Sequence, residues 1–396
     1  MKNWRTFPAL AVILALFIGL GLWARDPGEA GERSGDYSEY ETGKILKVLS
    51  DTTEPFPDSD NAYRGEQLLL VQVTSGQYAG KQLQVYNYVS PTYNVPLFQG
   101  DGVTVLISTY SDGTIRATVF EYDREWAIFL ILGLFLLVTV LVGGKTGVKS
   151  LLGLAVTIAA LFCLLIPLLF KGLPVIPTVF GVCALVSVAC FVILGGVHKK
   201  TCCAMLGTIL GMALAMAFGL FAQTICKIDG LRFTDVEPLL QLRQQGTPIG
   251  LKGLLVGGVI ISTLGAVMDV AMSLSSALWE VHCVDPTLGR GALFRSGMNV
   301  GRDMVGTMTN TLILALLGGS FVLILYLYSM GLSYHQLMSS SYLALEVISA
   351  IASSIGVILA VPLTALITSV ILAKDKKPKA PCGSKPEDKK LPKEVQ

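Results

Sequence analysis

Long apolar runs constrain this chain more than any other feature. A helix that crosses about 30 Å of hydrocarbon needs about 20 apolar residues. Charged residues make up only 15% of the chain, against about 25% in soluble globular proteins. We therefore predict a mostly α polytopic membrane helix bundle of about eight transmembrane helices, at Phe7–Trp23, Trp126–Val142, Leu151–Phe170, Val175–Val197, Met205–Cys226, Leu254–Leu278, Met304–Tyr328 and Tyr342–Ala373.

The distribution of Lys and Arg predicts the orientation of these helices. If the N-terminus is inside, the pieces on the cytoplasmic side carry 17 basic residues and the outer connections carry 5. Basic loops favour the cytoplasm, so both termini are expected there. Residues 1–24 are expected to form an uncleaved transmembrane anchor, with a cleaved signal peptide as the alternative.

Residues 25–125 have a different composition from the rest of the chain. Five β-branched or alternating segments separated by turn signals predict strands at Glu41–Ser50, Gln67–Thr74, Lys81–Val89, Gly102–Thr109 and Thr114–Tyr122. They suit a small extracytoplasmic β-barrel-like domain between the first two helices, and an OB-like barrel is one form of it. The 16 acidic against 8 basic residues argue against nucleic acid. A sugar ligand and an assembly or gating role remain open.

The remaining residues divide into a predicted seven-helix membrane domain, 126–373, and a disordered cytoplasmic tail, 374–396. The tail carries eight lysines, which favours contact with anionic lipid. One apolar run contains a small-residue ladder that predicts close helix packing, formed by Gly207, Gly211, Ala215 and Gly219.

Asp269 lies inside an apolar run, where a charge is costly. Steps of three and four residues place it on one helix face with Gly258, Ser262, Gly265, Ser273 and Ser276. Lipid cannot satisfy such a face, whereas another helix or a water-filled cavity can. Two interpretations follow: a polar zipper that holds helices together, or a path for protons, cations or substrate.

Two further runs carry polar stripes. On the run after Asp269, one face holds Asn299, Asp303, Gly306 or Thr307, and Asn310. Arg302 either pairs with Asp269 or is an interfacial anchor. In the last run, Glu346 begins a stripe that is either part of the path or interfacial. That run is too long for a straight crossing, so we expect a kink at Pro362 or a surface-lying start.

Motifs for enzymes and metal sites are missing from the sequence. There is no phosphate-binding GxxxxGK[ST] loop, GxSxG or HExxH. Cysteines and histidines occur close together at His198, Cys202 and Cys203, without the spacing of a zinc site. We therefore expect no enzyme, metal or cofactor, and an intramembrane hydrolase has no motif behind it.

The chain resembles the YibE/F-like family of bacterial membrane proteins. The resemblance is carried by GKILKV and GQYAGK in the β-rich region, and by GLLVGGVIISTLGAVMDVAMSLSSALWEV and FRSGMNVGRDMVGTMTNTLILALLGGS in the helical region. It implies a multi-pass protein of the bacterial cell membrane, and it implies no reaction.

Two functions remain open at this level. In the first, the protein is a secondary transporter or export permease. Asp269 would then titrate, since a buried carboxyl group can hold a proton near neutral pH, and the path would be lined by Ser262, Gly265, Ser273, Ser276, Arg302, Asp303, Thr307, Asn310 and Glu346. In the second, it is a non-transporting assembly factor, receptor or envelope scaffold that acts through its outer domain. The expected partners are the lipid bilayer, a second copy of the chain or an envelope protein.

Overall fold

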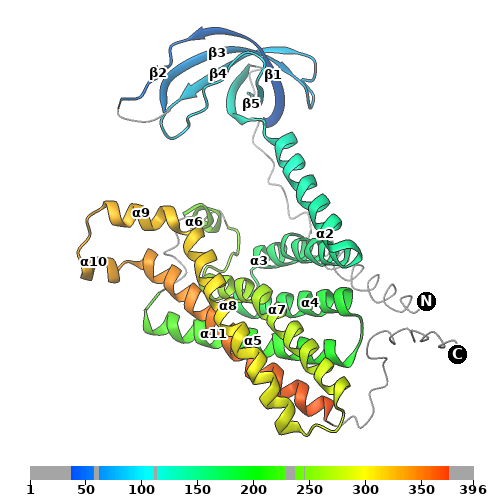
Figure 1. Cartoon of the computed structure of the whole chain (residues 1–396). Coiled ribbons are helices and arrows are strands. Elements are labelled where there is room, and N and C mark those ends of the chain that lie inside the picture. Colours follow the sequence, from blue (N-terminus) through cyan, green and yellow to red (C-terminus); the bar gives the residue numbers. More distant parts are fainter. Residues whose placement is uncertain (1–36, 58–61, 111–113, 229–236, 245, 374–396) are drawn as a thin grey trace, which may run out of the picture. The chain divides into compact units, whose positions relative to one another are not determined.

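The computed structural model describes residues 37–57, 62–110, 114–228, 237–244 and 246–373. It is mostly helical, with β-structure in its N-terminal part (Figure 1). The first apolar run and the lysine-rich tail lie outside the described residues. The described chain divides into two compact units, one ending at Gly144 and the other beginning at Lys145.

The five predicted strands are all present and close into a barrel. They are β1 Tyr37–Asp51, β3 Tyr63–Val73, β4 Gln82–Val89, β5 Gly102–Thr109 and β6 Ile115–Tyr122. β1 pairs antiparallel with both β3 and β5, and a parallel contact between β4 and β6 completes the ring. Two irregularities in β1, after Ile45 and after Val48, let one 15-residue strand bend between two partners. A two-residue strand, β2 Glu54–Pro55, adds to β3.

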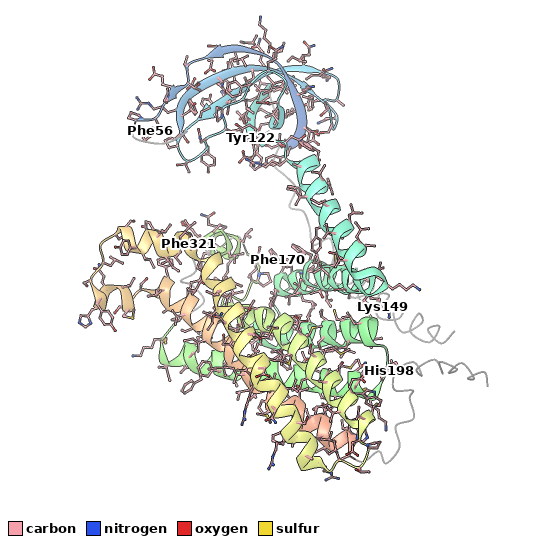
Figure 2. The ribbon with its side chains drawn as sticks, in the orientation of Figure 1. Phe56, Tyr122, Lys149, Phe170, His198 and Phe321 are labelled. Atoms are coloured by element: carbon pink, nitrogen blue, oxygen red, sulfur yellow. The ribbon has the colours of Figure 1, made fainter. Side chains whose placement is uncertain are left out.

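The barrel encloses its own core. Side chains that alternate along the strands fill the interior, among them Ile45, Leu69, Val85, Val105 and Ile107. Figure 2 labels Tyr122 at the end of β6, just before the next helix begins. Its hydroxyl group donates a hydrogen bond to the Pro96 carbonyl.

Two buried amides in the barrel satisfy each other. Asn87 Nδ2 donates to Gln67 Oε1 at 2.9 Å and to the Val95 carbonyl at 2.8 Å. Gln67 in turn donates to Asp51 Oδ2 at 2.9 Å. Because the polar atoms of this interior network are paired, its burial does not destabilise the barrel.

The first long helix, α2 Glu125–Ala160, continues through a π-helical turn, Leu161–Leu165, into α3 Ile166–Phe170. Residues 143–150, which separate two of the predicted runs, are helical except at Gly144 (φ 52°, ψ −132°). Glycine adopts this backbone conformation without steric cost. The 46-residue stretch would measure about 69 Å if straight. That is more than twice the hydrocarbon thickness, and the break at Gly144 divides it.

The unit that begins at Lys145 is a helix bundle centred on α11 Ser341–Leu372. This helix packs against α5 Lys199–Ile225, α7 Leu254–Val284 and α8 Arg290–Gly319. α4 Val175–Gly195 packs against α5 and α7. A short helix, α6 Glu237–Gln244, precedes α7. Two apolar clusters hold the bundle, one around α4 and α7 and one among α7, α8 and α11.

The predicted span Met304–Tyr328 is bent in the structure. α8 ends at Gly319, and α9 Phe321–Ser329 leaves it at an angle of 59°. Gly318, Gly319 and Ser320 at the bend are poor helix formers. By contrast α11, which follows α10 Tyr334–Met338, is one helix of 32 residues that contains Pro362.

Five helices in the described chain are long and apolar enough to cross a membrane, or six if α8 and α9 form one bent span. Seven were expected between residues 126 and 373. The difference arises because Glu125–Phe170 counts as one apolar stretch, although the non-helical backbone at Gly144 divides it into two helices that correspond to two of the predicted runs.

Candidate functional site

Asp269 lies midway along α7, equally far from Leu254 and Val284. The opposite face of α7 is buried and packs against α5, α8 and α11 through residues such as Val267, Val270 and Leu274. The apolar periodicity thus fixes which side of α7 faces the bundle. Asp269 lies on the other side of the helix and points away from the bundle.

The polar face of α7 is uncovered in the single chain. Asp269 and Ser273 are exposed, and no atom lies within 4 Å of a Cβ built at Gly258 or Gly265. Ser262 is half-buried, and its hydroxyl group is hydrogen-bonded at 2.7 Å to that of Ser353 on α11. Ser276 is also half-buried. Within the described residues, Ser262 thus joins the stripe to another helix, whereas Asp269 and Ser273 stay exposed.

The stripe on α8 is also exposed. Its members point away from the buried residues Leu293, Gly297 and Gly301. No ion pair joins Arg302 to Asp269 in the described part of the chain, so the structure does not bring the two charges together. The exposed members of the α8 stripe are Asn299, Arg302, Asp303, Gly306, Thr307 and Asn310.

The small-residue ladder of α5 lies against α11 along most of its length. A Cβ at Gly207 would stand 2.1 Å from Thr364 Oγ1, and one at Gly211 would stand 2.8 Å from Ala360 Cβ. Ala215 is buried beside Gly356. Gly219 instead faces α7, with its nearest atoms at an ordinary 3.8 Å. The two helices approach each other most closely between Gly207 and Ala215.

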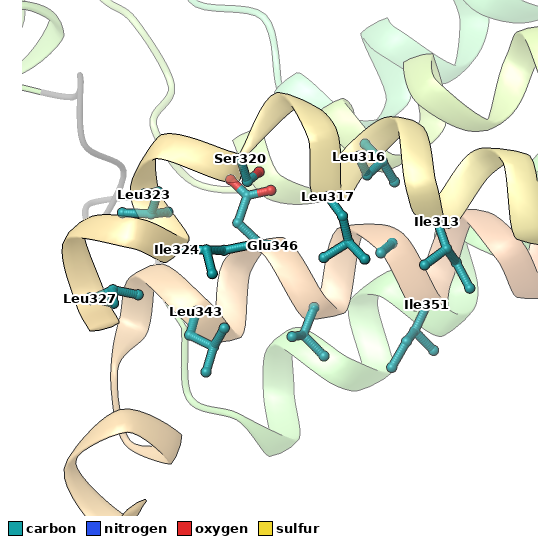
Figure 3. Close-up of a pocket in the computed structure, with 12 residues that line it drawn as sticks. Ile313, Leu316, Leu317, Ser320, Leu323, Ile324, Leu327, Leu343, Glu346 and Ile351 are labelled. Atoms are coloured by element: carbon teal, nitrogen blue, oxygen red, sulfur yellow. The ribbon is translucent and has the colours of Figure 1, made fainter. Parts of the chain in front are cut away.

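Glu346 lines a pocket of about 180 Å³ between α11 and the bend that joins α8 to α9. Its side chain points toward Ser320 at the bend (Figure 3). The other lining residues are apolar, contributed by α8, α9 and α11. The half-buried Glu346 carboxylate has neither a hydrogen bond nor an ion pair among the described residues. The sequence placed Glu346 on a stripe, but the pocket depends on the bend, which the sequence did not reveal.

Sequence reasoning also missed buried hydroxyl groups on α5 and α11. Thr208 and Thr364 are fully buried, and their Oγ1 atoms have no hydrogen-bond partner in the described structure. Threonine is common in apolar helices, so nothing in the sequence singles these two out. Among the described residues, no group of three or more His, Cys, Asp and Glu side chains could hold a metal ion.

The long apolar helices with charged and polar residues inside them support a membrane protein as the class. The family model described as YibE/F-like protein matches residues 131–374, which include every helix discussed above except the start of α2. The chain belongs to the YibE/F-like family. Searches of curated proteins and of solved structures each found no match.

Proposed function

We propose that this protein is a secondary transporter or export permease of the bacterial cell membrane, with Asp269 as its proton- or cation-carrying group. The observation that carries the proposal is the position of Asp269 at the middle of a long apolar helix, on an uncovered polar face. Ionisable residues inside membrane helices are rare and mark ion or substrate paths.

The proposed topology has both termini in the cytoplasm and the barrel outside. The distribution of basic residues supports it, since the pieces assigned to the cytoplasm carry more than three times as many as the outer connections. In this orientation Glu346, which lies near the start of α11, is close to the outer surface. The lysine-rich tail then faces the anionic inner leaflet.

Proton flux in proteoliposomes tests the proposal. A lumenal pH dye follows flux under an imposed potential for the wild type, Asp269→Asn and Asp269→Glu. We expect flux in the wild type, none in Asp269→Asn, and partial flux in Asp269→Glu, because only a carboxyl group titrates. Equal flux from the wild type and a correctly folded Asp269→Asn would rule out Asp269 as the carrier.

A second candidate function is supported by the barrel: binding a glycan outside the cell. The arrangement of β1, β3, β4, β5 and β6, closed through a parallel β4–β6 contact, matches an OB-type barrel, whose second and third strands bind oligonucleotides or oligosaccharides. The third barrel strand, β4, carries Tyr86 and Tyr88, 45% and 59% exposed, with nearly parallel rings 6.4 Å apart. Tyr86 also lines a cleft with Gln84, Tyr110 and Arg116.

Aromatic rings and amide or guanidinium groups together suit a sugar, which offers one apolar face and many hydroxyl groups. The acidic composition of the barrel disfavours nucleic acid. Titration calorimetry with chitotetraose tests this function. We expect binding that is lost in Tyr86→Ala and retained in Tyr40→Ala, an exposed tyrosine on β1. The glycan function is wrong if both variants bind as the wild type does, or if the wild type binds no chitotetraose.

A further inference from the structure

We propose that the Glu346 pocket binds a small apolar molecule that carries one positive charge, such as an arylalkylamine. The pocket is formed by three helices, α8, α9 and α11, and exists because α9 turns away from α8 by 59°. Lining residues from both sides of the bend include Ile313, Leu317 and Leu327 (Figure 3).

The size of the pocket limits its occupant. A dry apolar cavity of about 150 Å³ holds benzene, and this pocket measures about 180 Å³. One aromatic ring or a short branched alkyl group therefore fills it. Larger drug-like molecules, which occupy pockets of about 300–1,000 Å³, do not fit inside.

The charge of the occupant follows from Glu346. Glu346 is half-buried at the edge of this apolar pocket, its carboxylate points toward Ser320 (Figure 3), and no Lys, Arg or His side chain forms an ion pair with it in the described residues. The other polar lining residue is Ser320, whose hydroxyl group can donate one hydrogen bond but carries no charge. A carboxylate without a counter-ion in apolar surroundings is costly, and an ammonium group on the ligand would neutralise it.

This inference does not need Asp269 to carry protons. If the transport proposal is correct, the pocket identifies the substrate class as small organic cations. If it is not, the pocket remains a binding site on the outer half of the bundle, and the binding experiment below reports on it separately from proton flux.

The test is fluorine NMR of 4-fluorobenzylamine and 4-fluorobenzyl alcohol with the full-length protein in nanodiscs. The two probes have nearly the same shape and differ in charge. We expect saturable binding of the amine, at least about tenfold tighter than that of the alcohol, as for one charge-assisted hydrogen bond. Glu346→Gln should remove this preference and leave binding of the alcohol unchanged.

Two controls keep the outcome decisive. Val347→Trp fills the pocket from its α11 side and should abolish binding of both probes. Glu280→Gln makes the same chemical change at an exposed position on α7 that does not line the pocket, and should change nothing. Equal affinity of the two probes in the wild type, or an amine affinity that Glu346→Gln leaves unchanged, overturns the proposal, as does non-saturable partitioning alone.

Discussion

At the residue scale, the described carboxylates occupy contrasting environments. Asp51 in the barrel accepts hydrogen bonds from the Thr53 backbone, the Thr53 hydroxyl group and Gln67. Asp269 and Glu346 in the helices have no such partners among the described residues. The first arrangement stabilises an ionised carboxylate, and the second leaves it costly in an apolar medium.

The barrel should lose stability in acid through Asp51. Partial burial acts to raise the pKa of this carboxyl group, but the hydrogen bonds from Thr53 and Gln67 outweigh it and hold the pKa below 3.8. Because the folded-state pKa is lower than the unfolded one, the stabilisation is complete above about pH 5 and is lost as the pH falls through the folded value.

Urea unfolding of the barrel at about pH 5 and at about pH 3 measures this loss. The barrel can be produced alone because its core and its closed sheet come from its own residues. The decrease in unfolding free energy between the two pH values should be smaller in Asp51→Asn than in the wild type. An unchanged decrease would show that other carboxyl groups dominate.

Replacing Glu346 should stabilise the bundle. The unpaired carboxylate lies in an apolar pocket, so Glu346→Leu should raise the thermal unfolding temperature in detergent, while it removes amine binding. Functional residues often cost stability in this way. Ile351→Leu, which changes a lining residue without changing polarity, is the matched control and should leave the unfolding temperature nearly constant. A fall in the unfolding temperature of Glu346→Leu would mean that the Glu346 carboxylate has a stabilising partner in the folded protein.

At the element scale, contact between helices decides which glycines matter. Gly301 and Gly306 lie on the same helix, α8, but on opposite sides. A Cβ at Gly301 would stand 2.2 Å from Val361 Cγ1 of α11, whereas none of the surrounding atoms is within 4 Å of a Cβ at Gly306.

Gly301→Ala should therefore destabilise the protein by about 1–3 kcal/mol, since α8 and α11 must separate. Gly306→Ala should be neutral or slightly stabilising, because alanine favours a helix over glycine by about 1 kcal/mol. Reversible unfolding in mixed micelles compares the two. Equal effects would show that α8 can shift along α11 without cost.

At the scale of the whole molecule, the exposed polar face of α7 requires another protein surface packed against it in a membrane. Gly258, Ser262, Gly265 and Asp269 lie along this face with alternating spacings of four and three residues. This is the spacing of contact residues in left-handed helix pairs. The glycines leave open space for a close approach. A second copy of the chain, related by an axis along the membrane normal, would bring the two Asp269 side chains to equal depth, where two carboxyl groups can share one proton.

We therefore expect Gly265→Cys, in a chain otherwise free of cysteine, to form a disulfide-linked dimer in liposomes. Leu210→Cys, exposed on α5, is the control and should not cross-link. Because Gly265 has open space around it in the single chain, the variant should still fold. Cross-linking of both positions to the same extent would indicate random collisions instead of this interface.

The amino-acid sequence by itself determined the membrane class, the five strands and which face of each helix is polar. These properties depend on composition and on periods of two and 3.6 residues, which are local. The position of Asp269 on a polar face of α7 follows from the same periodicity.

Only the tertiary structure decided what covers each face. The bend at Ser320, the helical course from Lys145 to Ser150, and the separation of Arg302 from Asp269 depend on how helices distant in sequence pack together. Side-chain spacing gives the direction of a residue around its own helix, but it does not say which helix lies there. For the same reason the Glu346 pocket, made from three helices, became visible only in three dimensions.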